Sequence, residues 1–198
     1  MSSTEVARLD AQDERYVRAW FVPLDLLAPP HGWDPENLRL AIAQRRIPQP
    51  TYVLADGTAM LPADYFALVG DPAASASLRE RFFARYHAAC ARNELTADAC
   101  EAEWSAYLGG GYGACLKELS PEAIVHKTVL IARIETLLDA EAPDARDWVA
   151  RLRAAVDALD AIEKPFARSD RARFGGPVTR DRFIDDVRRR YPGIVEAS

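Results

Sequence analysis

A glycine-rich stretch in the middle of the chain combines residue types that could bind a ligand. Residues 107–115 read Tyr-Leu-Gly-Gly-Gly-Tyr-Gly-Ala-Cys and lie between two predicted helices. Glycines let backbone N–H groups approach a ligand closely, so Tyr107, Tyr112 and Gly113 are the candidate ligand-binding residues. No Gly-Lys-Ser/Thr follows and no predicted strand precedes the stretch, which is therefore not a P-loop.

Cys115 closes this stretch and is the candidate nucleophile. It precedes a predicted helical turn, where exposed N–H groups could stabilise a thiolate. Further along the chain, His126 could act as the base and Glu122 as the acid that orients it. The alternative is structural: the glycines turn the chain, and Cys115 is a small buried hydrophobic residue, as free cysteine usually is.

A second candidate site is the outer face of a predicted helix near the N-terminus. Asp34-Pro35 predicts its start, with aspartate as N-cap and proline at the first helical position, and we expect the helix to run to about Arg46. Arg39, Gln44 and Arg46 then lie on or near the outer face and are of the types that contact guanine and adenine edges. The alternative is that these residues are only solvated, because nearby acids would repel a phosphate backbone.

The cysteines indicate reduced thiols rather than a disulfide framework or a metal centre. Cys90, Cys100 and Cys115 form an odd and sparse set, which favours a cytoplasmic protein. His87 and Cys90 share one helical face, but no second pair with matching spacing completes a ligand set. We therefore expect no metal site and no cofactor.

Composition and charge exclude some functional classes. The chain has 198 residues, of which 49% are hydrophobic and 28% charged, and its net charge of −5 does not favour a nucleic-acid-binding protein. Only residues 166–198 carry net positive charge, all of it from arginine, and their apolar residues indicate that this tail docks on the body. No secretory signal is visible, and no apolar run approaches the roughly 20 residues of a membrane span.

Residues 1–70 are expected to follow the order of a helix-turn-helix and a short β-wing. Asp56-Gly57 is the strongest hairpin signal in the chain. The expected elements are a helix from Thr4 to about Phe21, a short helix over Leu24–Ala28, the helix that starts at Asp34-Pro35, a hairpin of strands 51–55 and 58–61, and a brief helix over 62–68.

Residues 71–198 are expected to be almost wholly helical. The long helix starting at Ser120-Pro121 and the next one, over Trp148–Ile162, should be antiparallel neighbours because their connector is short. The remaining expectations are a helix capped by Ser77, a helix capped by Thr96 and ended by Gly109-Gly110-Gly111, an extended segment over 168–178, and a last helix capped by Thr179 that ends before Tyr191. The predicted fold is thus mainly α, with a winged helix-turn-helix-like subdomain (1–70, one hairpin) packed on a helical bundle domain (71–198).

Two resemblances extend this interpretation. Residues 23–69 resemble the winged helix-turn-helix of MerR-type regulators and excisionases, in which the segment from Arg39 to Arg46 is the recognition helix. Residues 50–57, 62–66, 107–116 and 173–182 are similar to a poorly characterised family of small bacterial proteins linked to natural-product biosynthesis genes. That resemblance implies a cytoplasmic, biosynthesis-associated role and assigns no catalytic residue.

The combined expectation is a binding or accessory protein of a bacterial natural-product pathway. Its helix-turn-helix serves as scaffold or recognition module, and its partner is a biosynthetic protein or a small-molecule ligand, with no membrane. The alternatives are a DNA-binding transcriptional regulator, which the acidic charge disfavours, and a biosynthetic enzyme that uses the glycine-rich loop and Cys115.

Overall fold

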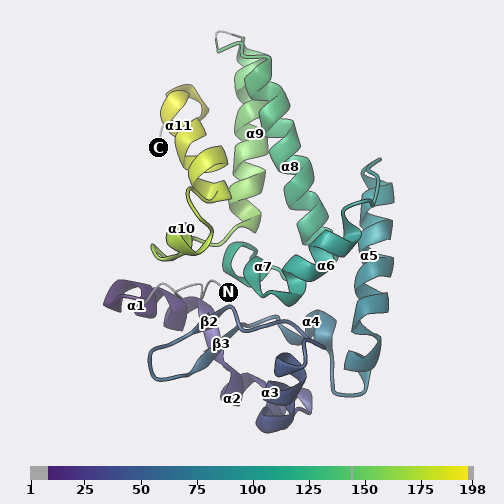
Figure 1. Cartoon of the computed structure of the whole chain (residues 1–198). Helices are drawn as coiled ribbons and strands as arrows, with labels where there is room; N and C mark the ends of the chain where they lie inside the picture. Colours follow the sequence, from purple (N-terminus) through teal and green to yellow (C-terminus); the bar gives the residue numbers. More distant parts are fainter. Residues whose placement is uncertain (1–8, 144, 196–198) are drawn as a thin grey trace.

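The computed structural model describes residues 9–143 and 145–195. This part of the chain is mainly helical and has one small antiparallel sheet (Figure 1). The elements of the first part are α1 (Ala11–Trp20), β1 (Phe21–Pro23), α2 (Leu24–Leu27), η1 (Pro29–His31), α3 (Pro35–Ala43), β2 (Tyr52–Val53), β3 (Ala59–Pro62), α4 (Phe66–Val69) and η2 (Ala74–Ser77). They are followed by α5 (Leu78–Arg92), α6 (Cys100–Leu108), α7 (Gly111–Cys115), α8 (Pro121–Asp139), α9 (Arg146–Ile162), α10 (Asp170–Arg173), the π-helical η3 (Asp181–Asp185), α11 (Asp186–Arg190) and η4 (Pro192–Ile194).

The predicted hairpin at Asp56-Gly57 is confirmed. β2 pairs with β3 in the register Tyr52↔Met60, and the Thr58 N–H donates to the Asp56 carboxylate at 2.9 Å. A third strand, β1, pairs with the other edge of β3, so the strand order is β1-β3-β2. The prediction missed β1 because three residues are too few to show strand alternation.

Two helices near the N-terminus are shorter than predicted. α1 starts after Asp10, whose carboxylate accepts from the N–H groups of Gln12 and Asp13, and the helix ends at Trp20 rather than Phe21. The proposed start at Thr4 lies outside the described residues. α3 has the expected Asp34 cap but ends at Ala43, before the proposed end near Arg46.

The reason for the early end of α3 is a backbone reversal. Arg45 has a φ of 54°, the left-handed conformation that a continuing helix cannot adopt. The order of two helices followed by a hairpin is as expected, while its assignment as a winged helix-turn-helix stays a prediction.

Ser120 is confirmed as the cap of α8, because its hydroxyl accepts from the Ala123 N–H at 3.2 Å. The other caps differ. Ser77 precedes α5 but makes no capping hydrogen bond, and Thr96 bonds Asp98 instead, so that α6 begins only at Cys100. Thr179 turns its hydroxyl away from the helix toward Glu163.

The segment over 168–178 is not wholly extended, because it contains the short helix α10. The tail does dock on the body, as predicted. Phe183, Ile184 and Val187 are buried in one cluster with α8 and α9, which lie side by side with α11 along α9 (Figure 1).

Two of the three hydrophobic clusters meet at α7. The largest cluster extends from α2 to α8 and includes residues on both sides of position 70. The second cluster joins α8, α9 and α11, and the third joins α1 to the sheet. Cys115 belongs to the first cluster and its neighbour Ala114 to the third. The short helix α7 is therefore held from two sides, which fixes the position of Cys115.

Candidate functional site

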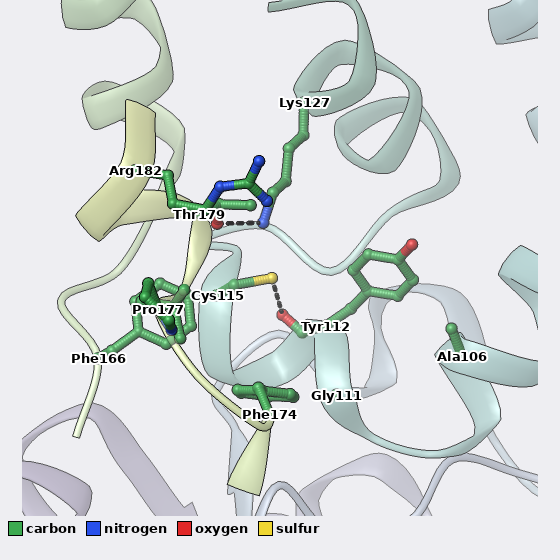
Figure 2. A pocket seen from close by; sticks show the side chains of 11 residues that line it. Ala106, Gly111, Tyr112, Cys115, Lys127, Phe166, Phe174, Pro177, Thr179 and Arg182 are labelled. Carbon is green, nitrogen blue, oxygen red and sulfur yellow. Dashed lines mark hydrogen bonds between the residues drawn. The ribbon is translucent and has the colours of Figure 1, made fainter. Parts of the chain in front are cut away.

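A cavity of about 330 Å³ opens beside α7 (Figure 2). Its walls come from α6, α7 and α8 and from residues 166–182, which lead from the end of α9 into η3. The lining residues are Ala106, Gly111, Tyr112, Cys115, Lys127, Phe166, Phe174, Pro177, Val178, Thr179 and Arg182. The volume falls within the range of small-molecule sites, roughly 300–1,000 Å³.

The glycines before Cys115 allow α7 to lie directly on the sheet region. Gly110 has a φ of 74°, and a Cβ atom there would be 2.5 Å from the carbonyl oxygen of Gln49. A Cβ atom at Gly113 would be 2.1 Å from Thr51 Oγ1. Gly110 thus turns the chain, as the structural alternative proposed, and it and Gly113 also allow close packing that the sequence did not predict.

The end of α7 is tied to the end of α9. Leu116 forms an antiparallel bridge with Glu163, and the Lys164 N–H donates to the Cys115 carbonyl at 2.8 Å. The side chain of Lys164 is also occupied, because its ammonium donates to the Gly113 carbonyl at 3.1 Å. This pairing brings Glu163 next to the wall that carries Cys115.

A buried polar network forms one end of the cavity. The Lys127 ammonium donates to Thr179 Oγ1 at 3.0 Å and lies 2.8 Å from Glu163 Oε1, and the Thr179 hydroxyl donates to the same oxygen at 2.5 Å. The side chain of Glu163 is 0% exposed and that of Lys127 11%. Glu163 Oε2 is buried and has no hydrogen-bond partner in the described part of the chain.

The same network acts on the thiol of Cys115. Burial raises the pKa of Cys115, and the nearby Lys127 ammonium opposes that effect by its charge and by hydrogen bonding. Burial also acts to lower the pKa of Lys127, but Cys115 and Glu163 outweigh it and leave the pKa above its usual value. The thiol therefore lies beside the buried ion pair of Lys127 and Glu163.

The remaining walls are apolar and aromatic, apart from Arg182. Phe166 and Phe174 meet edge to face with ring centroids 6.3 Å apart, and Tyr112 lies across the cavity from them (Figure 2). The Tyr112 hydroxyl donates a hydrogen bond to the Glu103 carboxylate. Burial is the main cause that raises the pKa of Tyr112, and this hydrogen bond is the second.

Arg182 differs from its neighbours in the tail. Arg180 is paired with Asp160 at 2.5 Å and Arg188 with Asp157 at 2.8 Å. Arg182 stacks over the Phe183 ring at 5.0 Å, and within residues 9–143 and 145–195 it has no carboxylate partner. Arg182 lines the same cavity as Lys127 and Thr179 (Figure 2).

Of the three ligand-binding residues that were predicted from the sequence, only Tyr112 lines the cavity. Tyr107 is fully buried in the largest cluster, and its hydroxyl has no hydrogen-bond partner among the described residues. Gly113 is buried against Thr51 and does not reach the cavity.

The proposed set of Cys115, His126 and Glu122 is not assembled, which corrects that interpretation. Glu122 and His126 line a different depression, about 450 Å³ in volume, between α5, α8 and the end of α9. There Glu122 is held by Arg85, which donates to both of its carboxylate oxygens at 2.8–3.1 Å. Lys127, the next residue of α8, is rotated by about 100° from His126 and approaches Cys115 instead.

The candidate nucleic-acid-binding residues do not share a helical face. Arg39 lies on α3 but pairs with Asp25 at 2.5 Å and with Glu36 at 2.6 Å. Gln44 only caps α3, and Arg46 lies beyond its end, where its side chain donates to Gln44 at 2.9 Å. The early end of α3 is the reason for this difference from the prediction.

Four members of the site were not predicted from the sequence: Lys127, Glu163, Thr179 and Arg182. One signal was available for Lys127, which is spaced at three, four and seven residues from the apolar positions Ile124, Ile131 and Ile134 of α8. A charged residue in an apolar helical stripe is buried only if it is paired, and so marks a special position. For Glu163 and Arg182 no comparable local signal exists.

Residues 78–192 match a family of unknown function, DUF6058. The chain belongs to this family, since the match spans more than half of its length and includes every residue that lines the cavity. No curated protein and no solved structure matches the chain. The link to natural-product biosynthesis and the resemblance of residues 23–69 to MerR-type regulators stay predictions.

Two further observations limit the kinds of site to consider. Within the described residues, no group of three or more histidine, cysteine or acidic side chains could hold a metal ion. None of the described helices has the length and apolar character that crossing a membrane requires.

Proposed function

We propose that this protein binds a small organic acid with an apolar, preferably aromatic, body. We propose further that it acts as a binding or accessory protein of a bacterial natural-product pathway, a role that the resemblance of residues 50–57, 62–66, 107–116 and 173–182 favours. The observation that carries the proposal is the cavity itself, which has aromatic walls and two cations, Lys127 and Arg182, at one end.

The distribution of charge in the cavity favours an anionic group on the ligand. Lys127 is already neutralised by Glu163, so the positive charge of Arg182 remains for a ligand. Arginine binds carboxylates through a planar fork of donors, and a site removed from bulk water strengthens such contacts. The rings of Phe166, Phe174 and Tyr112 supply apolar area for the rest of the molecule.

DNA binding is the weaker alternative. Arg39 is neutralised by two carboxylates, and the chain carries a net charge of −5. A protein that binds DNA needs a concentrated basic face to neutralise phosphates. In our proposal, the helices and hairpin of residues 24–62 serve as the scaffold on which α7 packs.

Titration calorimetry with 2-naphthoate tests the proposal, with neutral 2-naphthamide as the matched ligand. We expect one molecule of naphthoate per chain and binding of the amide at least about tenfold weaker, because a hydrogen bond to a charged group contributes about 1.5–3 kcal/mol. Arg182→Met should weaken naphthoate binding by a similar factor. Arg189→Met, which removes an exposed arginine outside the cavity, should leave it unchanged.

The proposal fails if neither naphthoate nor octanoate, which replaces the aromatic body by an alkyl chain, binds the folded wild-type protein at concentrations up to about 1 mM. It fails equally if naphthoate and naphthamide bind alike, since the charge of Arg182 would then have no role.

A further inference from the structure

We infer that Cys115 is an acyl acceptor, whose thiol takes the acyl group of an activated ester that is bound in the cavity. This ester is an oxoester or a thioester of an apolar carboxylic acid. The inference rests on the proposed function, because the acid whose anion the cavity binds is the acid whose acyl group reaches Cys115. It adds a covalent step that binding alone does not require.

The position of the thiol supports this assignment. Cys115 is 7% exposed, lies at the end of α7 and forms part of the cavity wall, so that a molecule in the cavity can reach a sulfur that bulk solvent hardly touches (Figure 2). Cys90 and Cys100 are also buried, but neither lines this cavity. A reaction directed by binding should therefore select Cys115.

Lys127 and Glu163 supply the route for the thiol proton. At rest, the Cys115 thiol donates to the Tyr112 carbonyl at 3.5 Å (Figure 2). In the proposed step, the thiol proton passes instead to Lys127 as Sγ attacks, while Lys127 passes one of its own protons to Glu163 Oε1, 2.8 Å away, so that the lysine remains an ammonium. Within the described residues, Glu163 Oε1 receives both donors and Oε2 has no hydrogen-bond partner, so this buried carboxylate keeps free capacity to accept a proton. This arrangement gives lysine the place that histidine holds in a Cys-His-acid triad.

The two cations also suit the negative charge that develops on the ester carbonyl. During attack, the carbonyl oxygen becomes an oxyanion, and fixed cations in a site with little water stabilise such charge strongly. Lys127 and Arg182 lie at the same end of the cavity (Figure 2). The end that binds a carboxylate thus also stabilises the tetrahedral intermediate.

The step balances without any further reactant. The Sγ–carbonyl bond forms, and the bond from the carbonyl carbon to the leaving oxygen or sulfur breaks. The proton lent to Glu163 returns through Lys127 to the leaving group. The products are an S-acyl cysteine and a free alcohol, phenol or thiol, with no change in oxidation state.

Incubation of the wild-type protein with 4-nitrophenyl benzoate tests the inference directly. We expect release of one equivalent of 4-nitrophenolate in a burst, an increase in intact mass by one benzoyl group, and its location on Cys115 by peptide mapping. Because Cys90 and Cys100 are internal controls in the same molecule, no variant is needed for this result. Modification of all three cysteines at similar rates, or of none, overturns the inference.

Variants then test the roles of the individual groups. Cys115→Ala should abolish the burst, while Cys100→Ala retains it. Glu163→Gln should slow acylation about 10²-fold and move the rate profile to higher pH, because the thiol proton must then leave to solvent. An unchanged pH profile in folded Glu163→Gln removes the relay from the inference.

The binding experiment separates the two proposals. Naphthoate should still bind Cys115→Ala, since the charge of Arg182 is intact. If naphthoate binds and the benzoyl group never reaches Cys115, the acyl-transfer inference fails and the proposed binding function stands. If naphthoate does not bind the wild-type protein, the proposed function itself fails.

Discussion

At the scale of single residues, Lys127 and Glu163 form a buried ion pair that should be costly to break. Their side chains are 11% and 0% exposed, so that neither charge can be rehydrated when its partner is lost. We predict that Lys127→Met lowers the free energy of unfolding by about 3 kcal/mol or more, since removal of one partner leaves the other charge buried and uncompensated.

Urea denaturation of Lys127→Met, Glu163→Gln and the double variant measures this effect. The double variant should be more stable than the sum of the single losses implies, because it leaves no unpaired charge. Simple additivity would show that the two residues are not coupled and would contradict the geometry described here.

At the scale of elements, the turn from α6 to α7 determines where the cavity wall lies. Gly110 has a left-handed backbone, which costs about 1–2 kcal/mol for other residues, and a Cβ atom there would be 2.5 Å from a backbone oxygen. We therefore predict that Gly110→Ala lowers the free energy of unfolding by more than about 2 kcal/mol.

Gly109→Ala is the matched control for this prediction. Its φ is −69°, and its Cβ atom would have a nearest contact of 3.4 Å, an ordinary distance. Thermal or urea unfolding should show a change within about 0.5 kcal/mol. Equal effects of the two substitutions would mean that the turn tolerates a left-handed alanine.

The elements also show which features a sequence can predict. Asp34, Ser120 and Asp56-Gly57 act within three or four residues of themselves, and the two caps and the hairpin were correctly predicted from them. Thr179 has the same local signature as a cap, but its hydroxyl finds Glu163 across the fold instead. A local sequence pattern does not show whether a side chain will bond a distant partner or a nearby backbone N–H group.

In the candidate site too, residues with a local signal were predicted and residues brought together by long-range contacts were not. Cys115 and Tyr112 were found because glycine, tyrosine and cysteine cluster in one stretch. The other members of the site reach the cavity only because α7 pairs with the end of α9 and the tail folds back over both. His126 was chosen over Lys127 by residue type, whereas the rotation of α8 decides which of them approaches the thiol.

At the scale of the whole molecule, the tail both completes the core and closes the cavity. Val178, Thr179 and Arg182 contribute to the cavity wall, while Arg180 and Arg188 bind Asp160 on α9 at 2.5 and 2.8 Å. Conditions that loosen the tail should therefore also weaken ligand binding. Asp160 offers a way to do so without touching the cavity.

Burial acts to raise the pKa of Asp160, but Arg188 and Arg180 outweigh it and hold the pKa below its usual value of 3.8. A carboxylate with a lowered folded-state pKa stabilises the fold above its unfolded-state pKa, and this stabilisation is lost as the pH falls through the folded-state value. We predict that Asp160→Asn lowers the free energy of unfolding by about 1 kcal/mol at neutral pH, a modest figure because the network is partly solvated. The difference from wild type should shrink below pH 3.8.

Urea denaturation at several pH values, together with naphthoate titration at neutral pH, measures both consequences. Asp147→Asn is the control, because its carboxylate forms an exposed pair with Arg151 on the same helix and not with an arginine of the tail. We expect Asp160→Asn to weaken naphthoate binding and Asp147→Asn to leave it unchanged. If Asp160→Asn reduces stability while the affinity for naphthoate stays at the wild-type value, the tail does not close the cavity. The arginine pairs would then hold the tail without shaping the cavity.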